Sequence, residues 1–428
     1  MNTEEMDEIT EHKYKHSNKR IEVLDAIMGS GKTKGIIRWM NENPNKKYLY
    51  VSPLLTEVED RIVNECASLG FVSPNTEGHN TKSDHLLELL SNGHNVAFTH
   101  NLFTEMKRDH LKYIDDWDYT LIIDEEIDFI NAYTGRDYKS TDILTLEKSG
   151  HVRLDEENLG RVVWTWEEDK FIKDSAYTRL KNMCDLEMLH CSKRREMMVT
   201  HLPISLITVA ERVIVMTYLF KGSVMDRFMQ MKGIQTEPFT EATLEKTEAD
   251  VKSSAENLIT IFKTPSTKKV SRLALSSNWY DNAKSEELKR VQSALRSACN
   301  KGHRDDVMYT LKKELVEPSN KKSKPKIRVN GYHPKDCFVS CAIKATNDYD
   351  TKSVLIHGFN RYPSLTVSSY LTDYGFPIKD DEFALSECIQ WIWRSRIRKG
   401  KSIQLCFLSP RMERIFRAWM DGQEDSLG

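Results

Sequence analysis

Long hydrophobic runs are the first thing that this 428-residue sequence lacks. Its most apolar stretch, residues 202–220, contains the adjacent charged residues Glu211 and Arg212, which a membrane-spanning helix would not readily bury. Residues 1–20 are polar and of mixed charge, without the apolar core of a signal peptide, and residues 1–18 have the composition of a flexible leader. We therefore expect no membrane partner and a cytoplasmic location.

Paired cysteines are also absent. The eight cysteines are scattered, and none forms the CxxC pairs of a structural zinc site. Scattered cysteines in a chain of this size are typical of a reducing compartment, where thiols stay free. Two loose groups remain as alternatives, although neither has zinc spacing: Cys184 with His190 and Cys191, and His333 with Cys337 and Cys341.

An excess of basic residues is the third absence. The formal net charge is −2, so overall charge does not indicate a nucleic-acid partner. A local basic face would be enough to bind nucleic acid, so this class of partner stays open. The length predicts two or three domains, and the sequence contains no repeat of short period.

What the sequence does contain is an alternation of apolar strand-like segments with helical segments. The first series of expected strands covers residues 22–26, 48–53, 95–100, 120–124 and 213–217. The second series covers residues 258–263, 272–277, 336–341, 353–358 and 402–409. Strands that alternate with helices predict parallel sheets flanked by helices, which is an α/β fold.

A phosphate-binding loop follows the first expected strand. Residues 26–33 read Ala-Ile-Met-Gly-Ser-Gly-Lys-Thr, which fits the Walker A pattern between a strand and a helix. Small residues let backbone N–H groups converge on a phosphate at the helix N-terminus, the lysine reaches the β- and γ-phosphates, and the threonine hydroxyl ligates Mg²⁺. The residues expected at ATP are Gly29, Ser30, Gly31, Lys32 and Thr33. The alternative is an ordinary Gly-Ser turn.

A second motif supplies carboxylates. The apolar segment Leu121–Ile123 leads directly into Asp124 and Glu125. Asp124 is expected to hold the Mg²⁺ shell, and Glu125 to polarise the attacking water. Glu126 and Asp128 are further acids at the same strand end. Together with the loop upstream, these residues predict an ATP-hydrolysing enzyme.

The order of motifs resembles that of superfamily 2 helicases of the DEAD/DEAH-like type, in the style of bacteriophage-encoded members. The segments that carry the resemblance are Walker A, "YVSP" (50–53), "FTHNLF" (98–103), "DEEID" (124–128), "MTYLFKGS" (216–223), "ALSSNW" (274–279), "KATNDY" (344–349) and "QWIWRSRIR" (390–398). They cover about 20–225 and 255–420. The sequence departs from the family in three of these segments. In "DEEID", which corresponds to motif II, the fourth position lacks the usual Asp or His. In "MTYLFKGS" (motif III), Thr217 stands in for a Ser-Ala-Thr triplet, and in "QWIWRSRIR" (motif VI), Trp393 replaces a glycine.

The resemblance implies two RecA-like domains, each with an insertion, and ATP in the cleft between them. The expected boundaries are a leader at 1–18, a first domain at 19–225 with an insertion at about 131–200, and a second domain at 226–428 with an insertion at about 280–335. The implied function is an ATP-dependent nucleic-acid helicase or translocase, acting on DNA in phage replication or recombination, in the host cytoplasm and with replication proteins as candidate partners.

Motif VI is expected to supply a cation to the γ-phosphate. We favour Arg394, then Arg398, which would share a helix face four residues apart, with Gln390 one turn earlier. The alternative is an exposed basic helix face with Trp391 and Trp393 packed inward.

Nucleic-acid contacts in such enzymes go mainly to the backbone. The candidates are small polar residues at strand ends, namely Ser52, Thr99, His100, Ser276, Ser277, Thr346 and Asn347. Each can equally be an ordinary strand-end or helix cap. The lysine-rich segment 321–326 is either a salt-sensitive contact or a solvated linker.

Two rival functions share the ATP site. A DNA-packaging motor of the terminase type would carry a nuclease domain with acids clustered at strand ends, whereas the acids Asp373, Asp380, Asp381 and Glu382 lie in a stretch with the composition of a proline-containing loop. An NTP-switched binding module would bind ATP without appreciable turnover.

Overall fold

The computed structural model describes residues 14–133, 140–166, 177–320, 324–341 and 348–423. The chain forms two compact units. The first contains the chain up to Asp25, then Lys32–Thr243 and Ser364–Ile378, and the second contains Ala26–Gly31, Leu244–Pro363 and the chain from Lys379 onward. Among the described residues, no helix has both the length and the apolar character needed to cross a membrane.

A six-stranded parallel sheet, in the order β11-β1-β10-β4-β2-β3, is the centre of the first unit. Its strands are β1 (Arg20–Asp25), β2 (Lys47–Ser52), β3 (Val96–Thr99), β4 (Tyr119–Asp124), β10 (Arg212–Thr217) and β11 (Gln235–Pro238). The α/β fold class predicted from the sequence is confirmed. The sheet extends past the boundary expected at residue 225, because β11 pairs with β1.

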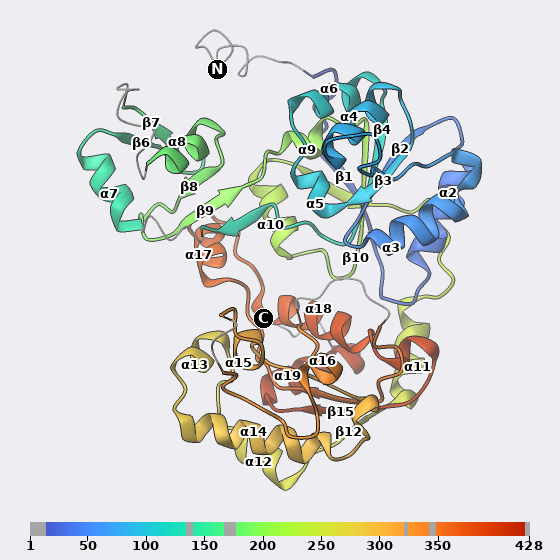
Figure 1. Cartoon of the computed structure of the whole chain (residues 1–428), viewed down its shortest axis with the longest axis vertical. Helices are drawn as coiled ribbons and strands as arrows, with labels where there is room; N and C mark the ends of the chain where they lie inside the picture. Colours follow the sequence, from blue (N-terminus) through green and yellow to red (C-terminus); the bar gives the residue numbers. More distant parts are fainter. Residues whose placement is uncertain (1–13, 134–139, 167–176, 321–323, 342–347, 424–428) are drawn as a thin grey trace. The chain divides into compact units, whose positions relative to one another are not determined.

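Helices pack around this sheet (Figure 1). They are α2 (Lys32–Glu42), α3 (Leu55–Glu57), α4 (Lys82–Ser91), α5 (His100–Thr104), α6 (Arg108–Asp116), α9 (Ser205–Thr208) and α10 (Val224–Met231), with short helical turns η1 (Val58–Val63) and η2 (Ala67–Leu69). The central strands are apolar on both faces because helices cover both: Leu121, Ile122 and Ile123 of β4 are buried. Local capping defines helix starts, as where Thr81 and Asp84 form a capping box on α4.

The second unit has a four-stranded parallel sheet in the order β12-β15-β14-β13. Its strands are β12 (Ile259–Ile261), β13 (Val307–Thr310), β14 (Val354–His357) and β15 (Ile403–Phe407). The helices are α11 (Glu248–Leu258), α12 (Pro265–Val270), α13 (Ser277–Asn282), α14 (Ser285–Cys299), α15 (Lys313–Val316), α16 (Pro334–Cys337), α18 (Asp380–Ile392) and α19 (Pro410–Met420), with turns η4 (Arg304–Asp306) and η5 (Arg396–Lys399).

Two strands expected here were wrong. Residues 272–277 form a turn and the start of α13, and residues 336–341 end α16 and continue as a loop with one bridge from Phe338 to Tyr309. The strand that fills the sheet is β13, which lies inside the insertion expected at about 280–335. The segment 285–310 therefore belongs to the core layer of this unit.

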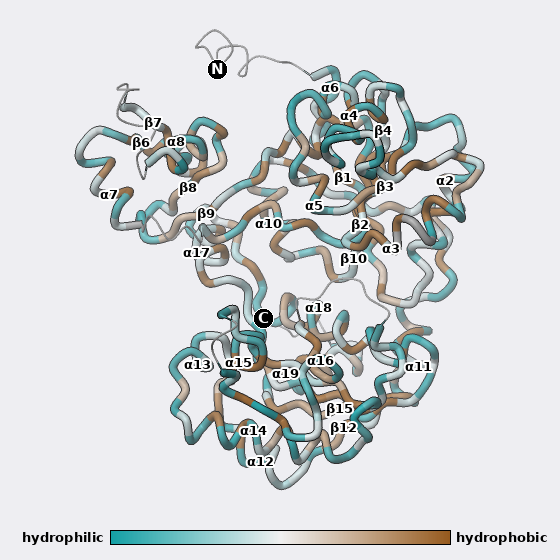
Figure 2. The backbone as a smooth tube through the Cα atoms, viewed as in Figure 1, coloured by the Kyte–Doolittle hydropathy of each residue, from teal (hydrophilic) through white to brown (hydrophobic). Residues whose placement is uncertain are grey.

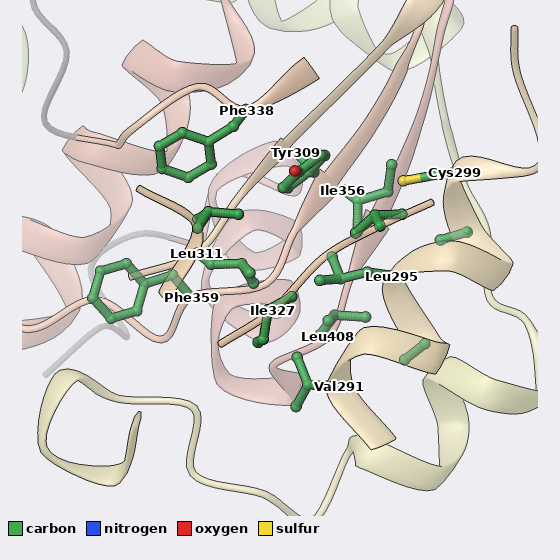
Figure 3. Close-up of a cluster of buried hydrophobic side chains, with 14 of the residues drawn as sticks. Val291, Leu295, Cys299, Tyr309, Leu311, Ile327, Phe338, Ile356, Phe359 and Leu408 are labelled. Atoms are coloured by element: carbon green, nitrogen blue, oxygen red, sulfur yellow. The ribbon is translucent and has the colours of Figure 1, made fainter. Parts of the chain in front are cut away.

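Helix α14 seals one face of the second sheet (Figure 3). Val291 and Leu295 project from it toward Ile356 of β14 and Leu408, and all four are buried. The backbone tube in Figure 2 is coloured as hydrophobic along β15 and β12 and as hydrophilic along α12 and α13. Burial of apolar area at about 25 cal/mol per Å² is the main stabilising contribution for such a layer.

The insertion expected at 131–200 is folded into a five-stranded antiparallel sheet, in the order β5-β9-β8-β7-β6. Its elements are β5 (Ile130–Ala132), α7 (Ser140–Lys148), β6 (Val152–Asp155), β7 (Arg161–Trp164), α8 (Thr178–Asp185), β8 (Leu189–Cys191) and β9 (Met198–His201). It has its own small core, which includes Ile143, Val162, Leu180 and Leu189.

A helix from late in the sequence packs against strands β5 and β9 of this insertion. Helix α17 (Leu365–Asp373) belongs to the first unit and lies beside β9 (Figure 1), although the residues on either side of 364–378 belong to the second. The Tyr370 hydroxyl donates to the Leu159 carbonyl oxygen at 2.7 Å, and the Tyr374 hydroxyl donates to the Cys191 carbonyl oxygen at 3.2 Å. The insertion is therefore attached through side chains as well as through its own two ends.

A buried pair of histidines lies next to this helix. The rings of His190 and His201 stack with centroids 3.7 Å apart, and Tyr370 contacts His201 edge-on. Nδ1 of His190 donates to the Met188 carbonyl oxygen at 3.2 Å, and neither ring nitrogen of His201 has a hydrogen-bond partner in the described part of the chain. Burial, together with the positive charge of Lys232, lowers the pKa of His190 to about 3, and burial lowers the pKa of His201.

Two glycines of the insertion allow a steric test. Gly160 and Gly150 both have left-handed φ, of 67° and 75°, but a Cβ at Gly160 would lie 2.1 Å from the Cys191 carbonyl oxygen, whereas one at Gly150 would meet nothing within 4 Å. Gly150→Ala should cost about 1 kcal/mol from φ alone, and Gly160→Ala at least about 2 kcal/mol more, because backbone must move. Urea unfolding followed by tryptophan fluorescence measures both, and equal costs would contradict the packing described at Cys191.

The histidine pair predicts loss of stability in acid. Each pKa is lower in the folded chain than the ordinary 6.5, so below pH 6.5 the unfolded chain binds more protons and stability falls as pH falls, for His190 down to its folded-state pKa of about 3. At pH 5 the loss should be about 2 kcal/mol for each histidine that stays neutral when folded. His201→Leu should flatten the dependence of urea midpoint on pH, and an unchanged slope would refute this origin.

Candidate nucleotide-binding site

The loop between β1 and α2 has the geometry that its sequence predicts. Gly29 and Gly31 have φ of 84° and 91°, a region that side chains with a Cβ rarely adopt. Lys32 is the first residue of α2 and is 9% exposed. The loop therefore turns back on itself and delivers the lysine at a helix N-terminus, where backbone N–H groups lack intrahelical partners.

The donors of this loop fit a phosphate. The Ser30 hydroxyl is buried and has no hydrogen-bond partner in the described part of the chain. The Ser30 carbonyl oxygen is held by the backbone N–H groups of Glu245 and Lys246, at 2.9 Å and 3.2 Å. A Cβ at Gly31 would come within 2.9 Å of the Glu245 side chain, so only glycine fits there. An anion with several oxygens would satisfy the buried hydroxyl.

The two predicted acids end β4 at the same carboxyl edge of the sheet. The Tyr50 hydroxyl donates to Asp124 Oδ2 at 3.1 Å, and His100 Nε2 donates to the Asp124 carbonyl oxygen at 2.8 Å. Glu125 has φ 66°, and its N–H donates to the Met216 carbonyl oxygen at 2.9 Å. A left-handed glutamate costs about 1–3 kcal/mol, a strain that commonly accompanies functional sites.

Strand β10 lies between β1 and β4 and ties their ends together. Glu126 accepts from the Thr217 hydroxyl at 3.3 Å and from the Ser223 hydroxyl at 2.7 Å. Asp25 accepts from the N–H groups of Leu219 and Phe220, at 2.8 Å and 3.0 Å. The sequence identified Thr217 as a substitute hydroxyl and Glu126 as an extra acid, but the roles of Asp25 and Tyr50 were missed.

A magnesium ion would find few protein ligands here. The described residues contain no group of three or more histidine, cysteine or acidic side chains arranged to hold a metal. Mg²⁺ usually keeps several waters and binds through one or two protein oxygens together with phosphates. Thr33 and Asp124 are the predicted protein ligands, and such a pair is consistent with that mode.

Three of the predicted nucleic-acid contacts, Thr99, His100 and Ser276, make hydrogen bonds within the protein, whereas the Ser52 hydroxyl has no partner among the described residues. Thr99 caps α5, Ser276 caps α13 by accepting from the Trp279 N–H at 3.3 Å, and Ser52 is fully buried. Thr346 and Asn347 lie outside the described residues. The contact roles of these residues therefore stay predictions.

The motif VI segment differs from the continuous helix expected. Helix α18 ends at Ile392, Arg394 lies in the following turn, and Arg398 is in η5, so the two arginines do not share a helix face. The reason is Ser395, whose hydroxyl donates to the Ile392 carbonyl oxygen at 2.7 Å and accepts from the Ile397 N–H at 3.5 Å.

The side chains around this turn are partly as expected. Trp391 and Trp393 are both buried, as the packing alternative predicts, and Arg394 is 8% exposed. Gln390 Nε2 donates to the Ser386 hydroxyl at 3.2 Å, within α18.

Comparisons with known proteins give remote similarities. The family described as "YonV C-terminal Rossmann-like domain" matches residues 253–420. The "SPbeta prophage-derived uncharacterized protein YonV" of Bacillus subtilis (strain 168) is 28% identical over 429 residues, covering 95% of this chain and 100% of that protein.

Similar solved structures share little sequence with this chain. One titled "XPD_APO" has a TM-score of 0.48 at 13% identity and covers 96% of each chain. The Xpd4 structure of S. tokodaii has a TM-score of 0.41 at 13% identity, covering 94% of each. The DUF1998 helicase MrfA bound to DNA and AMPPNP has a TM-score of 0.29 at 10% identity, covering 95% of this chain and 48% of that one.

The contacts of Glu126 predict a stability effect. Glu126→Ala leaves the buried Thr217 hydroxyl without this acceptor, and the unfolding free energy should fall by about 1–3 kcal/mol. Asp128→Ala, which truncates an exposed acid two residues later, should change it by no more than about 0.5 kcal/mol. Chemical denaturation measures both variants, and equal losses would mean that the bridge between β4 and β10 contributes little.

Proposed function

We propose that this protein is an ATP-driven nucleic-acid helicase or translocase that acts on DNA. The observation that carries the proposal is the shared carboxyl edge of the first sheet. There the glycine-bent loop with Lys32 and the acids Asp124 and Glu125 follow strands β1 and β4, which are separated by β10 alone. A second unit with its own parallel sheet provides the second half that a two-domain motor needs.

In this proposal each residue has one chemical task. Lys32 binds the β- and γ-phosphate oxygens, and Ser30 and the loop N–H groups hold the remaining oxygens. Thr33 and Asp124 hold Mg²⁺, which neutralises phosphate charge when bound. Glu125 accepts the proton of the attacking water, and its strained backbone fixes where that carboxylate points.

Arg394 is proposed as the cation that stabilises charge on the γ-phosphate, with Arg398 as the second choice. Arg394 is nearly fully buried, and a buried guanidinium is a stronger electrostatic partner than an exposed one. Gln390, in the last turns of α18, is proposed to act at the same phosphate end.

The proposed setting is phage replication or recombination, in the host cytoplasm and with replication proteins as partners. The prophage origin of the Bacillus subtilis relative supports the phage context. DNA is favoured over RNA on the resemblance to phage helicases.

A packaging motor and an NTP-switched binding module are the rivals. The packaging motor needs a nuclease centre, and the described residues contain no group of three or more acidic, histidine or cysteine side chains arranged to hold a metal. Cleavage of DNA in Mg²⁺ or Mn²⁺ would favour that rival, and tight ATP binding without turnover would favour the module.

The deciding experiment measures ATP hydrolysis by the full chain against a panel of single-stranded DNA, duplex DNA and RNA. We expect stimulation by at least one single-stranded nucleic acid, because binding of the strand and of ATP are coupled in a motor. An unstimulated rate with every nucleic acid in the panel would reject the motor proposal.

Variants at the site test the assigned roles. Lys32→Ala and Glu125→Gln should each reduce turnover at least about 100-fold, and Arg394→Ala should reduce it up to about 10³-fold while ATP binding is largely kept. Lys34→Ala is the matched control, since Lys34 is exposed two residues after Lys32 and should leave turnover within about twofold. Retained activity in Lys32→Ala would show that hydrolysis occurs elsewhere.

A further inference from the structure

An exposed aromatic ring lies at the carboxyl edge of the second sheet. Strands β14 and β15 are parallel neighbours, so the loops that follow them leave the sheet at the same edge. Ligands of parallel α/β sheets commonly bind at this edge. Tyr362 follows β14, and Arg411 lies in the first turn of α19, directly after β15.

The Arg411 guanidinium is fixed by hydrogen bonds along its edge. Nε donates to Asp381 Oδ1 at 2.8 Å, and one terminal nitrogen donates to Asn360 Oδ1 at 2.9 Å and to the Arg361 carbonyl oxygen at 2.7 Å. The other terminal nitrogen donates to the Asp380 carbonyl oxygen at 2.9 Å. With these donors used inside the protein, the flat faces of the group are what remains for further contacts.

Tyr362 rests on one of those faces. The guanidinium carbon of Arg411 lies 4.0 Å from the centre of the Tyr362 ring, the shortest cation–ring distance among the described residues. Tyr362 is nevertheless 42% exposed, one of four large apolar residues in the described chain with high exposure. Because Arg411 covers one side of the ring, the exposed area comes from the opposite face and the edges.

Asn360, which accepts a hydrogen bond from Arg411, connects this site to the segment where a contact with the nucleic-acid backbone is predicted. Asn360 N–H donates to the Leu275 carbonyl oxygen at 2.9 Å, and its side-chain amide donates to the Ala274 carbonyl oxygen at 3.0 Å. These two residues directly precede Ser276, a predicted backbone contact. A phosphate contact near Ser276 and a base contact at Tyr362 could thus serve the same strand.

We propose that Tyr362, backed by Arg411, is a stacking platform for an unpaired base of single-stranded nucleic acid. A rigid ring held on a guanidinium loses little side-chain freedom on binding, and base–aromatic stacking tolerates every base because each has a π-face. Arg414, whose side chain is 57% exposed, pairs at 2.5 Å with Asp381, the carboxylate that also pairs with Arg411, so two guanidinium groups share one carboxylate beside the platform. The inference rests on the proposed function and adds a base contact to a motor expected to hold mainly the backbone.

The test measures affinity of the full chain for a labelled oligothymidylate by fluorescence anisotropy. Tyr362→Ala should weaken binding roughly five- to a hundredfold, and Tyr362→Phe should bind within about twofold of the wild type, because the ring and not the hydroxyl makes the contact. Leu365→Ala is the matched control, a truncation of another exposed apolar residue, and should leave affinity unchanged. Equal affinity of Tyr362→Ala and wild type overturns the proposal, as does an equal loss in Tyr362→Phe.

A second arm does not depend on any variant. The wild-type chain is compared on the oligothymidylate and on an oligomer of the same length with abasic sugars, which keeps the phosphates and removes the bases. Stacking predicts clearly weaker binding of the abasic oligomer, and equal binding overturns it. If the wild type binds no nucleic acid at all, the proposed function itself fails, which is a different outcome from a Tyr362 variant that binds normally.

Discussion

The hydrogen bonds that join the carboxyl ends of β1, β4 and β10 hold the candidate nucleotide site in place. Asp25 accepts two backbone N–H groups from the segment after β10, and Glu126 accepts the hydroxyls of Thr217 and Ser223. A parallel sheet brings these ends to one edge, but it does not fix the loops that leave them. The carboxylates do so, and the loop with Lys32 and the strained Glu125 depend on that edge.

The first half of the chain was the easier half to predict. Its central strands are buried on both faces, so they appear in the sequence as short continuous apolar runs, and Pro53 after β2 and Glu125 after β4 mark where two of them end. The phosphate-binding loop and the acids after β4 were predicted for the same reason, since their chemistry requires adjacent residues in the chain. Tyr50 and Asp25 were missed because their partners lie far away in sequence.

The second half was harder because burial and strand formation do not coincide there. Residues 336–341 are apolar enough for a strand, yet Cys337 and Phe338 are buried at the end of a short helix. The strand β13, with sequence Val-Met-Tyr-Thr, is equally short and follows a charged helix, so nothing local distinguishes it from a loop. Helix α18 was predicted to continue through Arg398, and a single serine ended it at Ile392. Whether such short segments become strands, helices or loops depends on their contacts with distant parts of the chain.

The excursion that contains α17 gives the molecule an unusual connectivity. Apart from the short loop Ala26–Gly31, which is assigned to the second unit, the chain passes from the first unit to the second after Thr243, returns at Ser364 and leaves again after Ile378. Two bodies joined by one flexible linker can rotate about any axis, whereas bodies joined at several separate points lose most of those rotations. Tyr370, buried at the foot of the insertion, anchors the returning segment inside the first unit through its hydrogen bond to Leu159. The fifteen-residue segment 364–378 is thus continuous with the second unit at both of its ends while its own packing is with the first, so the fold of one unit is complete only after part of the other has been synthesised.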